Sequence, residues 1–217
     1  FRSAIALECV DGGVIENINI SNINGVNTGN AIFIRLGRRA GQTPGVVKNI
    51  LIKDVKVQVP FGRPDIDYDM RGPEVDFFHN PFPSSIVGIP GHNIENVVLE
   101  NIEISYPGRA SKGMAYIPLN RLVQVPEKEK DYPEFSMFGE LPAWGFYVRH
   151  ASGLSFKNIK LTLANEDFRP AFIFDDVDGL KMEKIKLPYP VKKQIILYKT
   201  NNEQLEGLSE FVAEILL

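Results

Sequence analysis

Six side chains of this sequence are of the types that bind sugars and carboxylates. They are Glu8, Arg35, Trp144, Tyr147, Arg149 and His150. A guanidinium group binds a carboxylate through two parallel hydrogen bonds, and flat aromatic groups stack on other planar or apolar faces. Arginine and tyrosine side chains on one strip of a sheet therefore favour binding of carbohydrate or carboxylate. The alternative is a solvated face of isolated charges.

The strip depends on how side chains alternate along strands. Successive side chains point to opposite faces, so the residues between inward apolar positions point outward. By this rule Glu8, Arg35, Tyr147 and Arg149 each point away from the core of their own segment. If these segments lie side by side, we expect the four side chains to share one exposed face.

A repeated strand pattern predicts that the segments do lie side by side. The pattern Asn-Ile-x-Ile-x-Asn-Ile at 17–23 returns at 49–55 and 96–102 and, more weakly, at 153–159 and 179–185. Apolar and polar residues alternate in every copy, which is typical of a strand with one buried face. A second apolar strand precedes each copy, and these strands are expected at 4–8, 31–37, 85–91, 145–150 and 171–176.

Strands that each bury one face favour a solenoid, in which stacked turns share one continuous core. We therefore predict an all-β fold, a single-stranded right-handed parallel β-helix with three short strands per coil. Stacking would align the Asn or Asp at the sixth position of four repeats in a hydrogen-bonded ladder. The alternative is a β-sandwich with Asn-rich turns. The apolar spacing in 204–217 predicts a short helix that caps the solenoid.

Two long insertions, 60–84 and 106–144, carry most of the aromatic residues of the loops. Long loops in compact folds are usually functional, so these are expected to wall a groove beside the strip. Most of their ten aromatic side chains are nevertheless expected to pack against the coils. Trp144 is the preferred ring for stacking on a sugar, and His150 is the best functional candidate among the three histidines. The ten are Phe61, Tyr68, Phe77, Phe78, Phe82, Tyr116, Tyr132, Phe135, Phe138 and Trp144.

Composition excludes several classes of function. The 217 residues, 44% of them hydrophobic, are expected to form one unit, 1–217, and the net charge of −3 provides no basic field for nucleic acid. Cys9 is the single cysteine, so neither a disulfide framework nor a thiolate metal cluster is expected. No apolar run reaches the ~18 residues of a membrane span. Nucleotide-binding and zinc-binding motifs are absent from the sequence, and no cofactor is expected.

Four stretches carry a resemblance to a known family. They are SAIALECVDGGVIENINISNI at 3–23, AIFIRLG at 31–37, SSIVGIPGHNIENVVLENIEISYPG at 84–108 and DYPEFSMFGELPAWGFYVRHASGLSFKNI at 131–159. The sequence resembles glycoside hydrolase family 28, the polygalacturonase group, and its bacterial branch in particular. This resemblance implies a secreted, extracellular or periplasmic β-helix that hydrolyses pectic glycosidic bonds with inversion. Such an enzyme needs an acid and a base carboxylate with room for water between them.

The sequence also departs from that family. The Asn-Thr-Asp, Asp-Asp and Gly-His-Gly motifs that hold the catalytic aspartates are missing, which implies a C-terminal fragment with no catalytic residue in this chain. The Arg-Ile-Lys motif, whose cations hold the substrate carboxylate, aligns with Ala6-Leu7-Glu8, and Glu8 would repel a uronate there. Asp175-Asp176 resembles the Asp-Asp motif but lies several coils too late, so a turn is expected at this pair.

The expected function is to supply the distal end of the substrate groove of a pectic glycoside hydrolase, with a pectic poly- or oligosaccharide as the partner. A non-catalytic carbohydrate-binding or adhesin β-helix is the alternative, because it would keep the groove without the chemistry. A polysaccharide lyase would share the fold class, but it would usually have a calcium site of clustered aspartates. The sequence shows no such cluster on the expected exposed strands.

Overall fold

The computed structural model describes residues 2–41, 43–61, 79–114, 117–188 and 193–215. Its ten strands belong to one sheet, and every pair of named strands is parallel. The prediction of an all-β fold is confirmed, and the parallel pairing contradicts the antiparallel β-sandwich. The strands are β1 (Ser3–Cys9), β2 (Val14–Gly25), β3 (Asn30–Leu36), β4 (Val46–Gln58), β5 (Ser84–Val87), β6 (Ile94–Tyr106), β7 (Phe146–Leu163), β8 (Phe172–Lys186), β9 (Ile195–Leu205) and β10 (Val212–Glu214).

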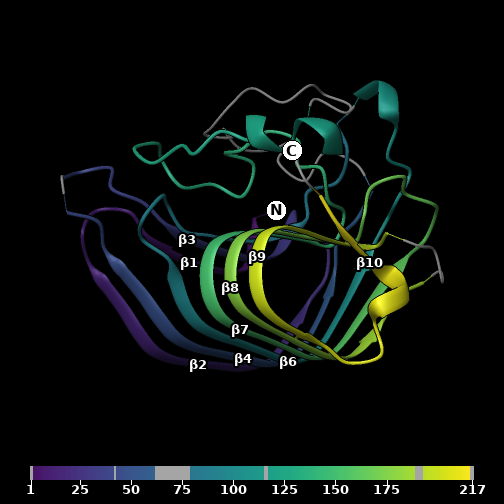
Figure 1. Ribbon diagram of the computed structural model, residues 1–217, viewed down its shortest axis with the longest axis horizontal. Coiled ribbons are helices and arrows are strands. Elements are labelled where there is room, and N and C mark those ends of the chain that lie inside the picture. Colours follow the sequence, from purple (N-terminus) through teal and green to yellow (C-terminus); the bar gives the residue numbers. More distant parts are fainter. Residues whose placement is uncertain (1, 42, 62–78, 115–116, 189–192, 216–217) are drawn as a thin grey trace.

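The long strands stack in register along the chain. Figure 1 shows β2, β4, β6, β7, β8 and β9 as nested curves that follow one another from the N-terminal to the C-terminal end. Corresponding repeat positions pair directly, as where Ile50 joins Ile18 to Val97. The strand β7 is long enough to pair with β5 along its first part and with β6 along the rest. All five predicted repeats therefore lie in neighbouring strands.

The first position of the repeat bends the strand. Asn17, Asn49 and Asn96 have positive φ angles of 57°, 57° and 54°, and Gly153 and Gly179 replace asparagine with φ of 65° and 76°. Asparagine and glycine tolerate this left-handed conformation better than most residues do. The asparagines also form a ladder, because each Nδ2 atom donates to the Oδ1 atom of the previous coil at 3.1 Å.

The sixth position makes a second bend and a second ladder. Asp54, Asn101 and Asn158 have φ of 55°, 56° and 53°, and Lys184 has φ of 55°. The Nδ2 atom of Asn101 donates to Oδ1 of Asp54 at 2.9 Å, and Nδ2 of Asn158 donates to Oδ1 of Asn101 at 2.8 Å. The predicted ladder is therefore confirmed for these three residues. It fixes the coil-to-coil register at each bend.

The enclosed core runs along the inside of the stacked strands. Four phenylalanines from the C-terminal coils pack ring against ring, with centroids 5.4 to 6.0 Å apart. They are Phe146, Phe156, Phe172 and Phe174. Cys9 is a buried residue of the same core.

A second core covers the opposite face of the first strands. Phe33, Tyr147 and Ile173 point outward from their strands as alternation predicts, but the insertion 106–144 packs on top of them. Figure 1 shows this teal segment lying across one side of the sheet with its two short 3₁₀ helices, η1 (Lys112–Met114) and η2 (Leu119–Gln124). The face that was expected to be exposed is therefore mostly an interface.

Packing of the aromatic side chains in the insertions agrees with this arrangement. Phe82, Phe135, Phe138 and Trp144 are buried, while Phe61 and Tyr132 remain 60% and 38% exposed. The other four, Tyr68, Phe77, Phe78 and Tyr116, lie outside the described residues. The prediction that most of the ten pack down is confirmed for four of the six that the structure describes.

The predicted capping helix is wrong over the described part of 204–217. The strand β9 extends through Leu205, and a short 3₁₀ turn, η3 (Ser209–Phe211), leads into β10. This last strand pairs in parallel with β9. Its backbone satisfies hydrogen-bonding groups that the edge of β9 would otherwise expose, which outweighs the helical spacing of the apolar side chains.

Candidate functional site

A row of residues crosses the first strands in register, and we call it the charged row. Glu8 pairs with Arg35, Arg35 with Val87, Val87 with Arg149, and Arg149 with Asp175. Neighbouring strands lie about 4.8 Å apart, so residues from distant parts of the sequence stand on one line. The expected alignment of Glu8, Arg35 and Arg149 on one face is confirmed.

Arg35 is buried, so its predicted exposure is wrong. Its Nη1 atom donates to the carbonyl oxygen of Gly88 at 2.9 Å, and Nη2 donates to the carbonyl oxygens of Glu127 and Lys128 at 2.7 and 3.0 Å. The guanidinium also lies 5.1 Å from the ring centroid of Phe138. Burial lowers the pKa of Arg35 to about 10. These contacts attach the insertion to the sheet and leave no bidentate face for a ligand.

The two aromatic candidates are also buried, which contradicts the prediction that they meet a sugar. Tyr147 lies under the insertion, and its hydroxyl donates to Oδ2 of Asp175 at 3.4 Å. Burial and the neighbouring Asp175 raise the pKa of Tyr147 well above its ordinary value. Trp144 is 1% exposed and packs edge-on against Tyr106, with centroids 5.7 Å apart. Its backbone N–H donates to the carbonyl oxygen of Pro170 at 3.0 Å, and its ring belongs to the enclosed core.

Arg149 joins two carboxylates that come from different segments. Its Nη2 atom lies 2.5 Å from Oε1 of Glu127 in the insertion, and its Nε atom lies 3.2 Å from Oδ2 of Asp175 in β8. A third contact runs from Nη1 to the carbonyl oxygen of Val125 at 2.8 Å. The side chain is 13% exposed, so the prediction that it stands on an open strip is wrong.

His150 bridges the same insertion to the next coil. Its Nδ1 atom lies 2.6 Å from Oδ2 of Asp176, and its Nε2 atom lies 3.2 Å from Oε2 of Glu127. Burial by itself lowers the pKa of His150, but the hydrogen bonds to Glu127 and Asp176 outweigh it and raise the pKa above 6.5. An imidazolium ring donates to both carboxylates at once. His150 is buried, although the end of an exposed strand was expected there.

The aspartate pair is divided between two roles. Asp176 has φ of 57° and forms a left-handed bend within β8, so the expected turn is present in part. Asp175 is instead a buried strand residue beside Arg149. Burial raises the pKa of Asp175, and Arg149 opposes that rise. For Glu127 burial also raises the pKa, but His150 and Arg149 reverse the shift and lower it.

We call Glu127, Arg149, His150, Asp175 and Asp176 the carboxylate cluster. Opposite pKa shifts on neighbouring carboxyl groups are a feature of acid–base sites, although structural ion pairs produce them as well. Solvent reaches the cluster mainly at Asp176 and Glu127, whose side chains are 52% and 28% exposed. These two oxygen-rich side chains are able to accept hydrogen bonds from hydroxyl groups.

Sequence reasoning missed the contribution of Glu127 and assigned Asp175 to a turn. Glu127 lies in the charged run Pro-Glu-Lys-Glu-Lys, and nothing in that run marks one acid as the partner of Arg149. The signal for Asp175 and Asp176 was available in the repeats, because their strand is aligned with the strand that contains Arg149 and His150. Sequence register therefore predicts the strand contacts but not the contact from the insertion.

Glu8 is the open end of the charged row. It is exposed, as predicted, and lies at the end of β1. Partial burial and the charge of Glu134 raise its pKa, while Arg2 lowers it. Arg2 is itself 3.5 Å from Glu134, which belongs to the insertion and is buried. The carboxyl group of Glu8 therefore keeps its proton to a higher pH than an ordinary glutamate does.

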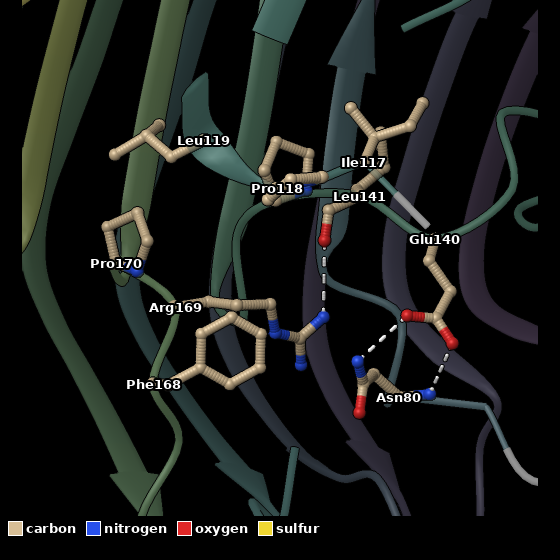
Figure 2. A pocket seen from close by; sticks show the side chains of 10 residues that line it. Asn80, Ile117, Pro118, Leu119, Glu140, Leu141, Phe168, Arg169 and Pro170 are labelled. Carbon is tan, nitrogen blue, oxygen red and sulfur yellow. Dashed lines mark hydrogen bonds between the residues drawn. The ribbon is translucent and has the colours of Figure 1, made fainter. Parts of the chain in front are cut away.

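A small hollow of about 70 Å³ lies beside the start of β8 (Figure 2). Figure 2 shows Arg169 and Glu140 at its polar side. Arg169 donates to Leu141 at 3.3 Å and forms an ion pair with Asp167 at 2.9 Å. Glu140 accepts two hydrogen bonds from Asn80, at 2.9 and 2.8 Å. These polar groups already have partners and the remaining lining is mostly apolar. We therefore interpret the hollow as a packing defect.

Comparisons with known proteins identify no relative of this chain. No protein-family model, curated protein or solved structure matches the chain. Within the described residues, no group of three or more His, Cys, Asp and Glu side chains is placed to hold a metal ion. Over the same residues, no helix has the length and apolar character needed to cross a bilayer.

Proposed function

We propose that this chain is the C-terminal part of a secreted, polygalacturonase-like glycoside hydrolase whose substrate groove reaches β1. In this proposal the fold is a single-stranded right-handed parallel β-helix, and the substrate is a pectic polysaccharide hydrolysed with inversion. The acid and base carboxylates belong to coils that precede this chain. The resemblance of four stretches to the family supports the proposal.

The observation that carries the proposal is where the charged row meets solvent. Glu8 is exposed, whereas Arg35, Val87 and Asp175 are buried and Arg149 is half-buried beneath the insertion. A polysaccharide that runs along the first strands therefore meets this chain at β1, and the insertion forms the wall at which the groove ends. The chain supplies an end of the groove rather than its middle.

Glu8 should make the binding of an acidic sugar at that end depend on pH. When it is ionised, its carboxylate repels a uronate, and when it is protonated, its O–H group donates a hydrogen bond to a uronate or a hydroxyl. Because its pKa is raised, protonation begins at a higher pH than for an ordinary glutamate. We therefore expect affinity for an acidic sugar to fall as the pH rises through the pKa of Glu8.

Titration calorimetry with trigalacturonate tests this assignment. Glu8→Gln removes the negative charge and should bind about two- to five-fold tighter than the unmodified chain at neutral pH, with a weaker dependence on pH. Glu8→Lys should increase the affinity further. Glu203→Gln removes an exposed charge at the far end of the fold and serves as the control. Equal affinities of Glu8→Gln and the unmodified chain at every pH would exclude β1 from the groove.

A non-catalytic carbohydrate-binding or adhesin β-helix is the second candidate. The observation that favours it is that Arg35 and Arg149 are each bound to other groups of this chain, Arg35 to carbonyl oxygens and Arg149 to carboxylates. Such contacts are typical of a structural network. Both candidates predict binding of saccharide. Only the hydrolase requires Asn-x-Asp and Asp-Asp motifs in the coils before β1, so the reading frame upstream of this sequence separates the two.

A further inference from the structure

An open hollow of about 430 Å³ lies where β4, β6 and β7 end, and we call it the strand-end hollow. None of its lining residues belongs to the charged row or to the carboxylate cluster. Its volume is in the range of pockets that hold small ligands. Its lining includes Gln58, Phe61, Ser105, Arg109 and Thr162.

The lining of the strand-end hollow includes a polar rung. Gln58 pairs with Ser105, and Ser105 pairs with Thr162, so an amide and two hydroxyl groups stand in register on three adjacent strands. Their spacing follows the ~4.8 Å separation of the strands. The Oε1 atom of Gln58 already accepts from the N–H group of Asn27 at 3.3 Å, so its Nε2 group and the two hydroxyl groups are the ones suited to bind sugar hydroxyls.

The rim of the hollow combines an aromatic ring with a cation. Phe61 is 60% exposed, and the guanidinium of Arg109 lies 5.2 Å from its ring centroid. Arg109 is also exposed, and among the described residues it forms no ion pair with a carboxylate. A ring offers an apolar face for a sugar, and a guanidinium group that has no carboxylate partner among the described residues is suited to bind a carboxylate.

The backbone that carries Arg109 is held in place before any ligand binds. Its N–H group donates to the carbonyl oxygen of Glu166 at 2.9 Å, and Nδ2 of Asn165 donates to the carbonyl oxygen of Pro107 at 3.1 Å. Gly108 makes this approach possible, because a Cβ atom there would lie 2.0 Å from the carbonyl oxygen of Asn165. A site on a fixed backbone loses less conformational entropy on binding.

From these features we propose that the strand-end hollow is a second binding site, specific for a uronate-containing oligosaccharide. Phe61 stacks on a sugar ring, Arg109 pairs with a sugar carboxylate, and the polar rung binds hydroxyl groups. The choice of a pectic ligand rests on the function proposed above. The site itself rests on the lining of the hollow and does not require Glu8.

Calorimetry with trigalacturonate on the 217-residue chain tests the site. Arg109→Ala should weaken the binding about ten-fold, because a charge-assisted hydrogen bond pair is lost, and Arg109→Lys should keep part of the affinity. Phe61→Ala should weaken both trigalacturonate and neutral cellotriose, whereas Arg109→Ala should affect only the acidic ligand. Lys181→Ala, which removes an exposed cation outside the hollow, is the matched control.

The same titrations separate this site from the groove at β1. An effect of Arg109→Ala that persists in the Glu8→Gln background would support an independent site. Unchanged affinity in folded Arg109→Ala would overturn the strand-end site, and the Glu8 variants would then decide the groove by themselves. Equal affinity for cellotriose and trigalacturonate would also overturn it, because a guanidinium site must discriminate by charge.

Discussion

Arg35 and Arg149 occupy the same row of the sheet but have different kinds of partner. Arg35 donates to main-chain carbonyl oxygens at the edge of the insertion, whereas Arg149 lies between the carboxylates of Glu127 and Asp175. The difference follows from which segment of the insertion passes over each coil. At the residue scale, therefore, the segment that packs over each coil decides which partners a buried cation has.

Arg35→Ala should destabilise the protein strongly. It removes the hydrogen bonds to the carbonyl oxygens of Gly88, Glu127 and Lys128 and leaves those of Gly88 and Glu127 without this donor, so we expect a loss of ~3 kcal/mol or more of unfolding free energy. Urea denaturation measures this loss. Arg39→Ala breaks an exposed pair with Asp11 and an exposed contact with the ring of Tyr132, and should change the midpoint little. A small effect of Arg35→Ala would mean that water replaces the guanidinium group.

His150 should make stability depend on pH. Its pKa is raised in the folded state, so the stabilisation is complete below the ordinary pKa of 6.5 and is lost as the pH rises through the folded-state value. The ring faces Glu127, Asp176 and the cation of Arg149, and protonation is favoured by the first two. His150→Asn keeps a residue that tolerates φ of 49° but does not titrate. The free energy of unfolding, measured by urea denaturation between pH 6 and about 9, should therefore depend less on pH in the variant than in the original chain. An equal dependence on pH would contradict the assignment.

At the scale of elements, the left-handed bends organise the strands. Asn17, Asn49, Asn101 and Asn158 each place one residue at positive φ inside a strand, and their side chains join one coil to the next. A strand that bends at the same position in every coil keeps its neighbours in register. The amide ladders therefore determine the path of the coils as well as adding hydrogen bonds.

Substitution of Asn101 separates these two contributions. Asn101→Gly allows positive φ but removes the hydrogen bonds with Asp54 and Asn158, so a loss of ~0.5–1.5 kcal/mol is expected. Asn101→Ala loses the same bonds and adds ~1 kcal/mol for the left-handed conformation. Thermal or urea unfolding should therefore rank the original chain first, the glycine variant second and the alanine variant last. The reverse order of the two variants would show that the bend carries no strain.

At the scale of the whole molecule, the first strands lie between two hydrophobic cores. The enclosed core is built by the repeats, and the outer core is built by the insertion 106–144 on the opposite face of the same strands. This arrangement seals most of the charged row and leaves Glu8 at its open end. A ligand therefore has access at β1 and at the strand-end hollow rather than along the full face.

The isolated 217-residue chain should bind trigalacturonate without hydrolysing it. In the function proposed above, the acid and base carboxylates lie before β1, and the carboxylates of the cluster are engaged by Arg149 and His150. A reducing-end assay on polygalacturonate should therefore show no release above a heat-denatured control. Release of reducing ends would mean that the chain contains its own acid and base, and Glu8 and Asp175 would be the first residues to substitute.

The sequence by itself determined the features that depend on short-range periodicity. Alternation identified the strands, turned Arg35 and Tyr147 away from the enclosed core, and aligned the repeats that form the ladder of Asp54, Asn101 and Asn158. These features follow from the two-residue period of a strand and from the residue types that accept positive φ.

Only the tertiary structure decided which outward face is open. Packing of the insertion buried Arg35 and Tyr147, brought Glu127 to Arg149, and drew Trp144 into the core. Pairing with β9 likewise replaced the expected helix after Leu205 with the strand β10. These outcomes depend on contacts between segments far apart in the chain, where the burial of apolar area outweighs local preference. No local pattern in a loop specifies the surface on which that loop packs.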